Sequence, residues 1–200
     1  MEKNNRRKFL TRSMAFLSST GILSILWPFL SYMSPTARER GAGAPVKVDI
    51  SNLKDGEKID LIWRKKPIWI IRRSKAMIDG IELEENKYKD PLSENLSQQP
   101  EFARNKYRSL KPEILVLEGI CTHLGCNPSF RPKIESKNLD NVWSGGFFCA
   151  CHGSKFDFAG KVYSGVPAGA NLKVPPYRFV DDNTIVIGEM PSNKDEESAA

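Results

Sequence analysis

The hydropathy pattern of the first 45 residues separates an apolar stretch from a short polar one. Residues 13–35 carry no charged side chain and are mostly apolar. As a helix, a run of this length spans the hydrocarbon core of a bilayer, which is ~30 Å thick. Residues 36–45 are small, polar and glycine-containing, which is typical of a linker. The pattern therefore predicts a transmembrane helix over 13–35 and a flexible hinge over 36–45.

The pattern beyond residue 45 predicts a mainly β domain over residues 46–190. Short runs rich in β-branched residues alternate with turn residues, which is typical of strands in an antiparallel sheet. Asp181-Asp182-Asn183 joins the last two runs as a hairpin. We also expect short helices over 77–85, after Ser74, and over 93–104, with an irregular polar segment over 87–112 as the alternative to the second helix, and a disordered polar tail over 191–200. The predicted strands cover residues 46–50, 59–63, 68–71, 114–117, 177–180 and 184–187.

The charge distribution points to a membrane rather than to nucleic acid. The chain has a formal net charge of +6, and its first twelve residues contain five basic residues and one acidic residue. In the rest of the chain, basic and acidic residues are interspersed, without the basic stripe of a nucleic-acid-binding surface. The basic leader over 1–12 predicts a cytoplasmic N-terminus by the positive-inside rule, so the domain lies on the opposite side of the membrane.

The leader also contains a candidate export signal. Asn5-Arg6-Arg7-Lys8-Phe9-Leu10-Thr11 resembles a twin-arginine signal, which directs export of proteins that fold before crossing a bacterial membrane. Two adjacent arginines in a basic anchor are the simpler alternative. Ala42-Gly43-Ala44 has the small-x-small form of a processing site, so cleavage of the leader remains an alternative to a permanent anchor.

All four cysteines and both histidines fall in two short segments, which we call the first box (residues 121–126) and the second box (residues 149–154). Thiolates and imidazoles are soft and borderline metal ligands, so the pairing of boxes indicates a metal centre. One tetrahedral zinc ion needs only four ligands, and the spacings differ from zinc-finger patterns. Two disulfides are a further alternative outside the cytoplasm. A two-iron cluster held by two cysteines and two histidines would leave one cysteine per box to form a disulfide.

The boxes resemble the signature of the Rieske iron-sulfur proteins of bacterial quinol:cytochrome c reductases, the cytochrome bc complexes. The first box reads Cys-Thr-His-Leu-Gly-Cys and the second reads Cys-Ala-Cys-His-Gly-Ser. The resemblance extends to residues 41–46, 66–73, 145–148 and 171–176. It implies a Rieske-type antiparallel β-sandwich with a cluster-binding subdomain, whose loops lie within 119–175, tethered to one transmembrane helix.

The resemblance also implies a role for each residue of the boxes. Cys121 and Cys149 would bind the inner iron of a single 2Fe-2S cluster, and His123 and His152 the outer iron. Cys126 and Cys151 would form a disulfide. Leu124 would shield the cluster, and Ser154 would donate a hydrogen bond to a cluster sulfur.

The function implied by the resemblance is electron transfer within a respiratory enzyme. Ubiquinol would be oxidised at the cytochrome b subunit, with His152 and His123 as the catalytic contacts. The electron would pass to the cytochrome c-type haem subunit, with proton release that builds the proton gradient. The resemblance further implies a dimeric complex in the bacterial inner membrane, with one span and a periplasmic domain. Nucleic acid is not an expected partner.

Two positions depart from the commonest family pattern. Phe156 stands where many members have a tyrosine whose hydroxyl donates to a ligating sulfur, so we expect a lower reduction potential. In residues 165–169, which we call the cover loop, Gly169 replaces a proline, so we expect a less rigid loop.

Two other Rieske classes remain alternatives. Rieske ferredoxins and oxygenases generally lack the additional cysteine in each box and the membrane anchor. The small Rieske subunit of arsenite oxidase is also exported, so it is distinguished by a large molybdenum partner.

Overall fold

The computed structural model describes residues 2–36, 41, 43–81, 86–132, 143 and 145–191. The chain divides into two compact units, Met1–Gly41 and Ala42–Ala200. We call the second unit the head. Of the predicted hinge over 36–45, residues 37–40 and 42 lie outside the described residues, as do residues 192–200 of the predicted tail.

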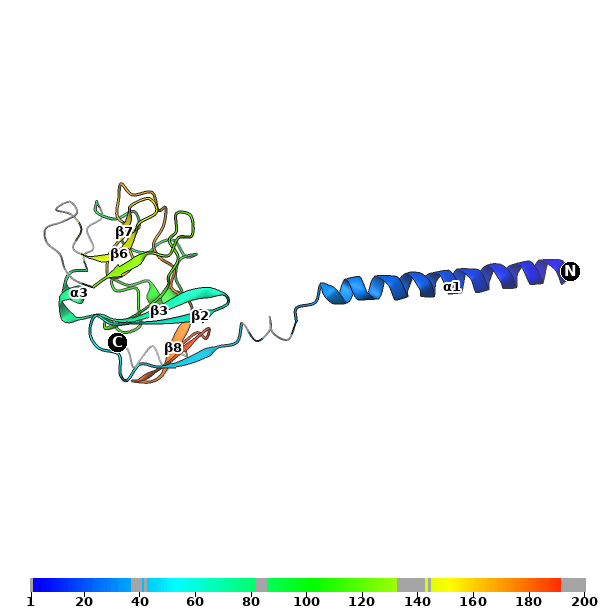
Figure 1. The fold of residues 1–200 in the computed structure, drawn as a ribbon, viewed down its shortest axis with the longest axis horizontal. Helices are drawn as coiled ribbons and strands as arrows, with labels where there is room; N and C mark the ends of the chain where they lie inside the picture. Colours follow the sequence, from blue (N-terminus) through cyan, green and yellow to red (C-terminus); the bar gives the residue numbers. More distant parts are fainter. Residues whose placement is uncertain are drawn as a thin grey trace. The chain divides into compact units, whose positions relative to one another are not determined.

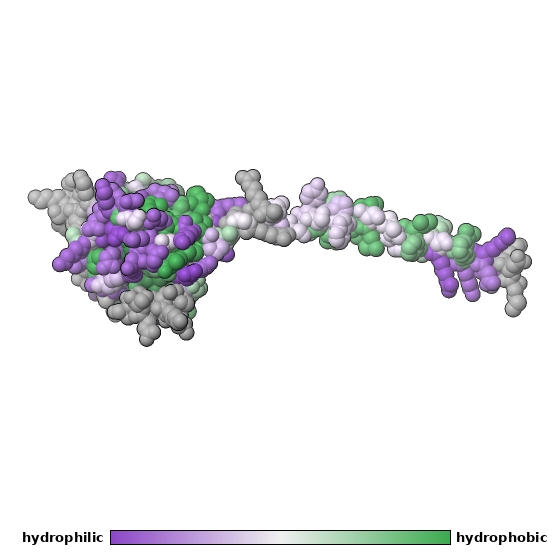
Figure 2. Space-filling view, turned by 90° about the horizontal axis from the view of Figure 1, so that it is seen from below, coloured by the Kyte–Doolittle hydropathy of each residue, from purple (hydrophilic) through white to green (hydrophobic). Residues whose placement is uncertain are grey.

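The long helix of the N-terminal unit is α1, over Glu2–Tyr32. Within the described residues, it is the one helix whose length and apolar composition suit a membrane span, over Asn4–Tyr32. Its hydroxyl side chains bond to carbonyls of the preceding turn, as from Thr20 to Phe16 and from Ser24 to Thr20. Such bonds satisfy polar groups that lipid cannot. Figure 2 shows hydrophilic residues at the N-terminal end of α1 and mainly apolar ones beyond it. The basic leader and the apolar stretch thus share one continuous helix.

In the part of the head that the structure describes, the strands form three antiparallel sheets of three strands each, which confirms the predicted mainly antiparallel β class. Their orders are β1-β9-β8, β2-β3-β4 and β5-β6-β7. Figure 1 shows β6 and β7 at one end of the head, β8 at the other, and β2 and β3 between them. The strands are β1 (Val46–Asp49), β2 (Lys58–Trp63), β3 (Lys66–Arg72), β4 (Ile114–Glu118), β5 (Ser129–Arg131), β6 (Gly146–Cys149), β7 (Ser154–Phe156), β8 (Tyr177–Asp181) and β9 (Thr184–Ile187).

Strands β3 and β4 form the centre of the hydrophobic core. All five residues of β4 are buried, and β3 is buried from Ile68 to Ile71. Both strands are continuous apolar runs rather than alternating ones, which is the pattern of strands covered on both faces. Pairing places Trp69 opposite Leu117 and Ile70 opposite Val116. This middle sheet, β2-β3-β4, is called the base sheet below, and the first box follows directly from its strand β4.

The turn between β2 and β3 has an unexpected backbone. Trp63 pairs with Lys66, so Arg64 and Lys65 form a two-residue turn, and both have positive φ, at 51° and 63°. Such turns favour Asn-Gly because side chains crowd this conformation. The Arg64 guanidinium lies 4.4 Å from the Trp63 ring centroid, a cation–π contact that offsets part of this strain. The sequence therefore predicted the two strands but not the turn.

The helix predicted over 93–104 is wrong. That segment contains only a single 3₁₀ turn, Glu101–Ala103. The Asp90 carboxylate accepts hydrogen bonds from the backbone of Glu94 and Asn95, and Asn95 in turn bonds the backbone of Ser97. Short polar side chains that bond nearby backbone groups compete with helix formation. The helix predicted over 77–85 is confirmed only in part: α3 covers Lys75–Asp79, with the Ser74 hydroxyl as its N-cap, and residues 82–85 lie outside the described residues.

The sequence did not predict the third sheet, because its strands have only three or four residues and lie among glycines and cysteines. Gly146, with φ of 120°, shows why glycine is needed there. A Cβ at this position would lie 2.2 Å from the carbonyl oxygen of Phe156, so any side chain would push β6 away from β7. The second box, predicted on a loop, is therefore part of a β-hairpin.

Candidate metal centre

The two boxes reach the same end of the head by different routes. The first box is a loop between β4 and β5, and the second box spans the turn between β6 and β7. Cys149 is the last residue of β6 and pairs directly with Ser154, the first residue of β7. Residues 150–153 therefore form a four-residue hairpin loop, with His152 in its second half.

The same turn recurs in both boxes. The Gly125 N–H donates to the Cys121 carbonyl at 3.0 Å, and the Gly153 N–H donates to the Cys149 carbonyl at 2.9 Å. Both glycines have positive φ, at 83° and 77°. A Cβ at either position would meet nothing within 4 Å, so backbone conformation, and not space, calls for glycine. Each turn begins at a cysteine whose side chain is buried.

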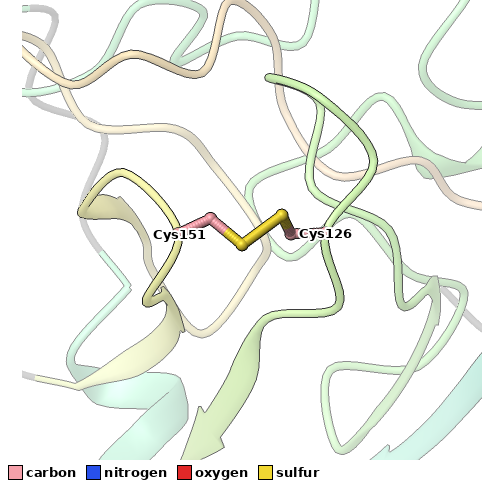
Figure 3. The surroundings of a disulfide bond; sticks show 2 residues. All are labelled: Cys126 and Cys151. Atoms are coloured by element: carbon pink, nitrogen blue, oxygen red, sulfur yellow. A yellow bond between two sulfur atoms is a disulfide. The ribbon is translucent and has the colours of Figure 1, made fainter.

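The four cysteines divide into two pairs. Cys126 and Cys151 form a disulfide that joins the two boxes (Figure 3), which is the pairing that the resemblance implied. Cys121 and Cys149 carry free thiols and are each only 2% exposed. The Cys149 sulfur lies within 4.8 Å of both disulfide sulfurs, which are already bonded to each other and thus not free to bind a metal. The free pair consists of one cysteine from each box.

The two histidines lie beside each other at the surface. The ring centroids of His123 and His152 are 4.7 Å apart, and the rings are nearly perpendicular at 87°. His152 is exposed, whereas His123 is half-buried. The free donors of the two boxes thus form a buried thiol pair and a more exposed imidazole pair.

Electrostatics in the absence of metal favour the protonated form of Cys121. Burial raises the pKa of this thiol, and the neighbouring Cys149 thiol adds to the rise. Hydrogen bonds from the His123 backbone and from the Ser154 hydroxyl act in the opposite direction. A metal binds the thiolate, so loading this site releases protons.

The other two predicted site residues lie at opposite extremes of exposure. Ser154 is fully buried, and its hydroxyl oxygen accepts a hydrogen bond from the Ala168 N–H at 3.0 Å. Leu124 is 70% exposed and lies at the outermost part of the first box. This exposed leucine, the chain neighbour of His123, adds apolar surface to the first box.

Phe156 contributes no hydrogen-bond donor to this site. Its side chain is fully buried and pairs across the hairpin with Phe147. The Trp143 indole donates to the Phe156 backbone carbonyl at 3.2 Å, so the residue is held through its main chain. The predicted lower potential is thus consistent with an apolar side chain at this position, but it stays a prediction.

Two residues near the boxes were not identified from the sequence. Lys89 donates to the carbonyls of Val166 and Ala168 in the cover loop, each at 2.7 Å. The Thr122 hydroxyl donates to the carbonyl of Ala170, which follows the cover loop. Lys89 lies 32 residues before the first box in an otherwise polar segment, so no local signal marks it.

The donor set fits an iron-sulfur cluster with two thiolate and two imidazole ligands. Cys121 and Cys149 supply buried sulfurs, His123 and His152 supply nitrogens, and the disulfide holds the two boxes together. Buried thiolates on one side and exposed imidazoles on the other suit a cluster with an inner and an outer iron. Four such donors also suit one zinc ion, so the donor set alone does not choose between the two.

Comparison with known proteins makes that choice. The family described as Rieske [2Fe-2S] domain matches residues 85–176. The ubiquinol-cytochrome c reductase iron-sulfur subunit of Allochromatium vinosum is 45% identical over 92% of this chain and 88% of its own length. The subunit of the same description from Bradyrhizobium diazoefficiens is 41% identical over 92% of this chain and 94% of its own length. A chain of a solved hyperthermophilic respiratory Complex III matches at 23% identity, over 88% of this chain and 98% of that chain, with a TM-score of 0.46.

Proposed function

This chain belongs to the family of ubiquinol-cytochrome c reductase iron-sulfur subunits, with a Rieske 2Fe-2S cluster as cofactor, and we propose that it carries electrons from ubiquinol to a c-type haem. Its place is within a cytochrome bc complex, beside the cytochrome b subunit and the cytochrome c-type haem subunit. One observation carries the proposal. Two free thiols and two imidazoles meet at one end of the head, while the remaining cysteine of each box closes a disulfide.

Cys121 and Cys149 hold the inner iron in this proposal, and His123 and His152 hold the outer iron. The burial of both thiols and the greater exposure of the imidazoles support this division. When bound, the cluster supplies a one-electron acceptor, at a potential of about −150 to +300 mV in Rieske proteins. The Ser154 hydroxyl stabilises the reduced state by donating toward the buried sulfurs, because reduction adds negative charge there.

His152 makes the contact with quinol. It is the more exposed of the two imidazoles, and the ring nitrogen that faces away from the metal accepts a hydrogen bond from the quinol hydroxyl. The same nitrogen would take the quinol proton, and the bound cluster would accept the electron. Leu124 packs against the apolar wall of the quinol site and excludes water from the contact.

The head moves between its two partners in this proposal while α1 stays in the bilayer. The basic leader favours a cytoplasmic N-terminus, which puts the head and the released protons on the periplasmic side. The hinge over 36–45 is long enough to reach ~30 Å if extended. Prolines introduced into it should slow turnover and leave the cluster spectrum unchanged, and unaltered turnover would argue against a moving head.

The direct test is purification of the complex from membranes with the intact chain. We expect equal amounts of iron and acid-labile sulfide, the low-temperature electron paramagnetic resonance signal of a reduced Rieske cluster, and ubiquinol-dependent reduction of cytochrome c. His152→Asn should abolish that activity, whereas Lys47→Ala, an exposed change on β1, should not.

Other results would overturn the proposal. Zinc in place of iron would contradict the cofactor assignment. A molybdenum-containing partner in place of haem subunits would instead identify an arsenite oxidase type of complex.

A further inference from the structure

The cover loop is held by hydrogen bonds from three directions. The Lys89 ammonium donates to the carbonyls of Val166 and Ala168, each at 2.7 Å. On the other side, the Ala168 N–H donates to the Ser154 hydroxyl oxygen at 3.0 Å. Just after the loop, the Ala170 carbonyl accepts from Thr122 of the first box. Ala168, which is fully buried, is therefore fixed on both of its backbone polar groups.

Lys89 is held in place by its own backbone. The Lys89 N–H donates to the Val162 carbonyl at 3.1 Å, and the Ser164 N–H donates to the Lys87 carbonyl at 2.9 Å. Between them, Tyr88 forms an antiparallel bridge with Tyr163, and their ring centroids are 5.0 Å apart. This short ladder ends at Ser164, directly before the cover loop. The Lys89 side chain therefore starts close to the loop and can donate to its carbonyls.

Segment 87–90 is also hydrogen-bonded to the residues that follow the cover loop. The Asn171 amide donates to the Asp90 carbonyl at 2.9 Å, and its oxygen accepts from the Val162 N–H at 2.9 Å. Asn171 is fully buried. The segment 87–90 thus holds both ends of the cover loop, and Lys89 holds its middle.

The contacts of Ala168 lead directly to the metal ligands. The Ser154 hydroxyl has one hydrogen to donate, and one lone pair of its oxygen accepts from the Ala168 N–H. An oxygen that accepts from Ala168 directs its own hydrogen away from that N–H, and Ser154 is buried and pairs directly with the ligand residue Cys149 across the hairpin. A displaced Ala168 would leave the hydroxyl free to rotate to other acceptors.

We propose that Lys89 is a positioning residue for the metal centre, which holds Ala168 so that its N–H orients the Ser154 hydroxyl toward the sulfurs of the site. This inference rests on the proposed function. It also gives a role to Gly169, because a glycine in this loop has more backbone freedom than a proline and leaves the loop dependent on its hydrogen bonds. In this chain the Lys89 ammonium, from a segment distant in sequence, restrains the cover loop in place of a proline ring.

The test is a double-mutant cycle on the reduction potential in the intact complex. Lys89→Met keeps the length of the side chain but removes its donors. Since a hydrogen bond to sulfur stabilises the reduced cluster, we expect Lys89→Met to lower the midpoint potential, by less than Ser154→Ala does. In the Ser154→Ala background, Lys89→Met should cause no further shift, because the hydroxyl through which it acts is gone.

Three further measurements separate positioning from charge and from general loosening. Lys89→Arg, which retains donors, should keep most of the potential. Lys173→Met removes an exposed positive charge close in sequence to the cover loop and should leave the potential unchanged. Amide hydrogen exchange over 165–170 should rise in Lys89→Met and stay at the original level in Lys173→Met.

An equal shift in both Ser154 backgrounds would overturn the proposal, because it would show a direct charge effect. An unchanged potential in Lys89→Met would overturn it as well. Failure of the proposed function is recognised separately, since the unmodified complex would then show no Rieske signal to titrate.

Discussion

The base sheet and the tip of the head, which comprises the two boxes, strands β5–β7 and the cover loop, are stabilised by different kinds of interaction. In the base sheet, β4 is buried along its whole length, and its partner β3 adds four consecutive buried residues. In the tip, the strands have three or four residues. Its loops are joined by the Cys126–Cys151 disulfide, by hydrogen bonds that Lys89 and Thr122 donate, and by one that the Ser154 oxygen accepts.

The difference follows from what each region must do. Burial of apolar area is the largest favourable contribution to folding, and the base sheet uses it fully. In the proposed function the tip presents His152 and Leu124 to a partner, and both residues are exposed. Phe147, Phe156 and Ala168 of the tip are buried in the same core as the base sheet, and cross-links add to this burial as a source of its rigidity. Substitutions in the two regions should therefore change different measured properties of the protein.

The largest expected effect is on the cofactor. Cys121→Ser or Cys149→Ser removes one buried thiolate ligand, and a serine hydroxyl is a poor ligand for iron at neutral pH. We expect loss of the cluster, measured as the absence of the reduced Rieske signal and of acid-labile sulfide. The same stoichiometry of cluster in either variant would refute the ligand assignment. The base sheet should remain folded, as judged by the far-ultraviolet circular dichroism of the chain.

A matched pair of leucines compares the two regions directly. Leu117→Ala in the base sheet removes a fully buried side chain and should lower the free energy of unfolding by about 2–5 kcal/mol. Leu124→Ala in the tip removes a side chain that is 70% exposed, and it should change the free energy of unfolding by less than about 0.5 kcal/mol. Denaturant unfolding of the full chain measures both. Similar losses for the two variants would contradict the proposed contrast.

Removal of the disulfide should weaken the tip selectively. The double variant Cys126→Ser/Cys151→Ser opens a link between residues 25 positions apart, and native disulfides of this kind contribute about 2–4 kcal/mol. We expect the cluster to be lost at a lower temperature. Hydrogen exchange should rise in both boxes and remain slow in β3 and β4. Faster exchange throughout the base sheet would mean that the two regions unfold together.

The smallest effect expected is at Phe156. Phe156→Tyr adds a hydroxyl near the ligand sulfurs, and one hydrogen bond of ordinary strength corresponds to a rise in potential on the order of tens of millivolts. Redox titration monitored by electron paramagnetic resonance measures the shift. Phe158→Tyr, at another buried phenylalanine outside the hairpin, is the control for general effects of an added hydroxyl. A potential that does not rise would remove the explanation based on a missing donor.

The same contrast explains which parts of the structure were predictable. The strands over 68–71 and 114–117 were identified because buried strands are continuous apolar runs. Strands β5–β7 were missed, since strands of three or four residues near glycines and cysteines carry no periodic signal. The helix over 93–104 was predicted wrongly, because Asp90 and Asn95 bond the local backbone instead. The turn at Arg64 and Lys65 was missed because neither residue is typical of positive φ.

The candidate site was predictable in its chemistry but not in its arrangement. All cysteines and histidines of the chain lie in two boxes, so the ligand types followed from composition alone. The assignment of each cysteine came from the family resemblance, because spacing treats the two cysteines of a box alike. Lys89 was not identifiable, since its contacts are with residues more than 70 positions away.

The sequence by itself determined the apolar anchor, the base strands and the metal-binding chemistry, because each is a local property of hydropathy or residue type. Only the tertiary structure decided that His152 is more exposed than His123, that Cys121 and Cys149 remain free, and that Lys89 reaches the cover loop. These features depend on how distant segments meet. The physical reason is that burial and hydrogen bonding at the tip arise between segments, each of which carries only part of the pattern.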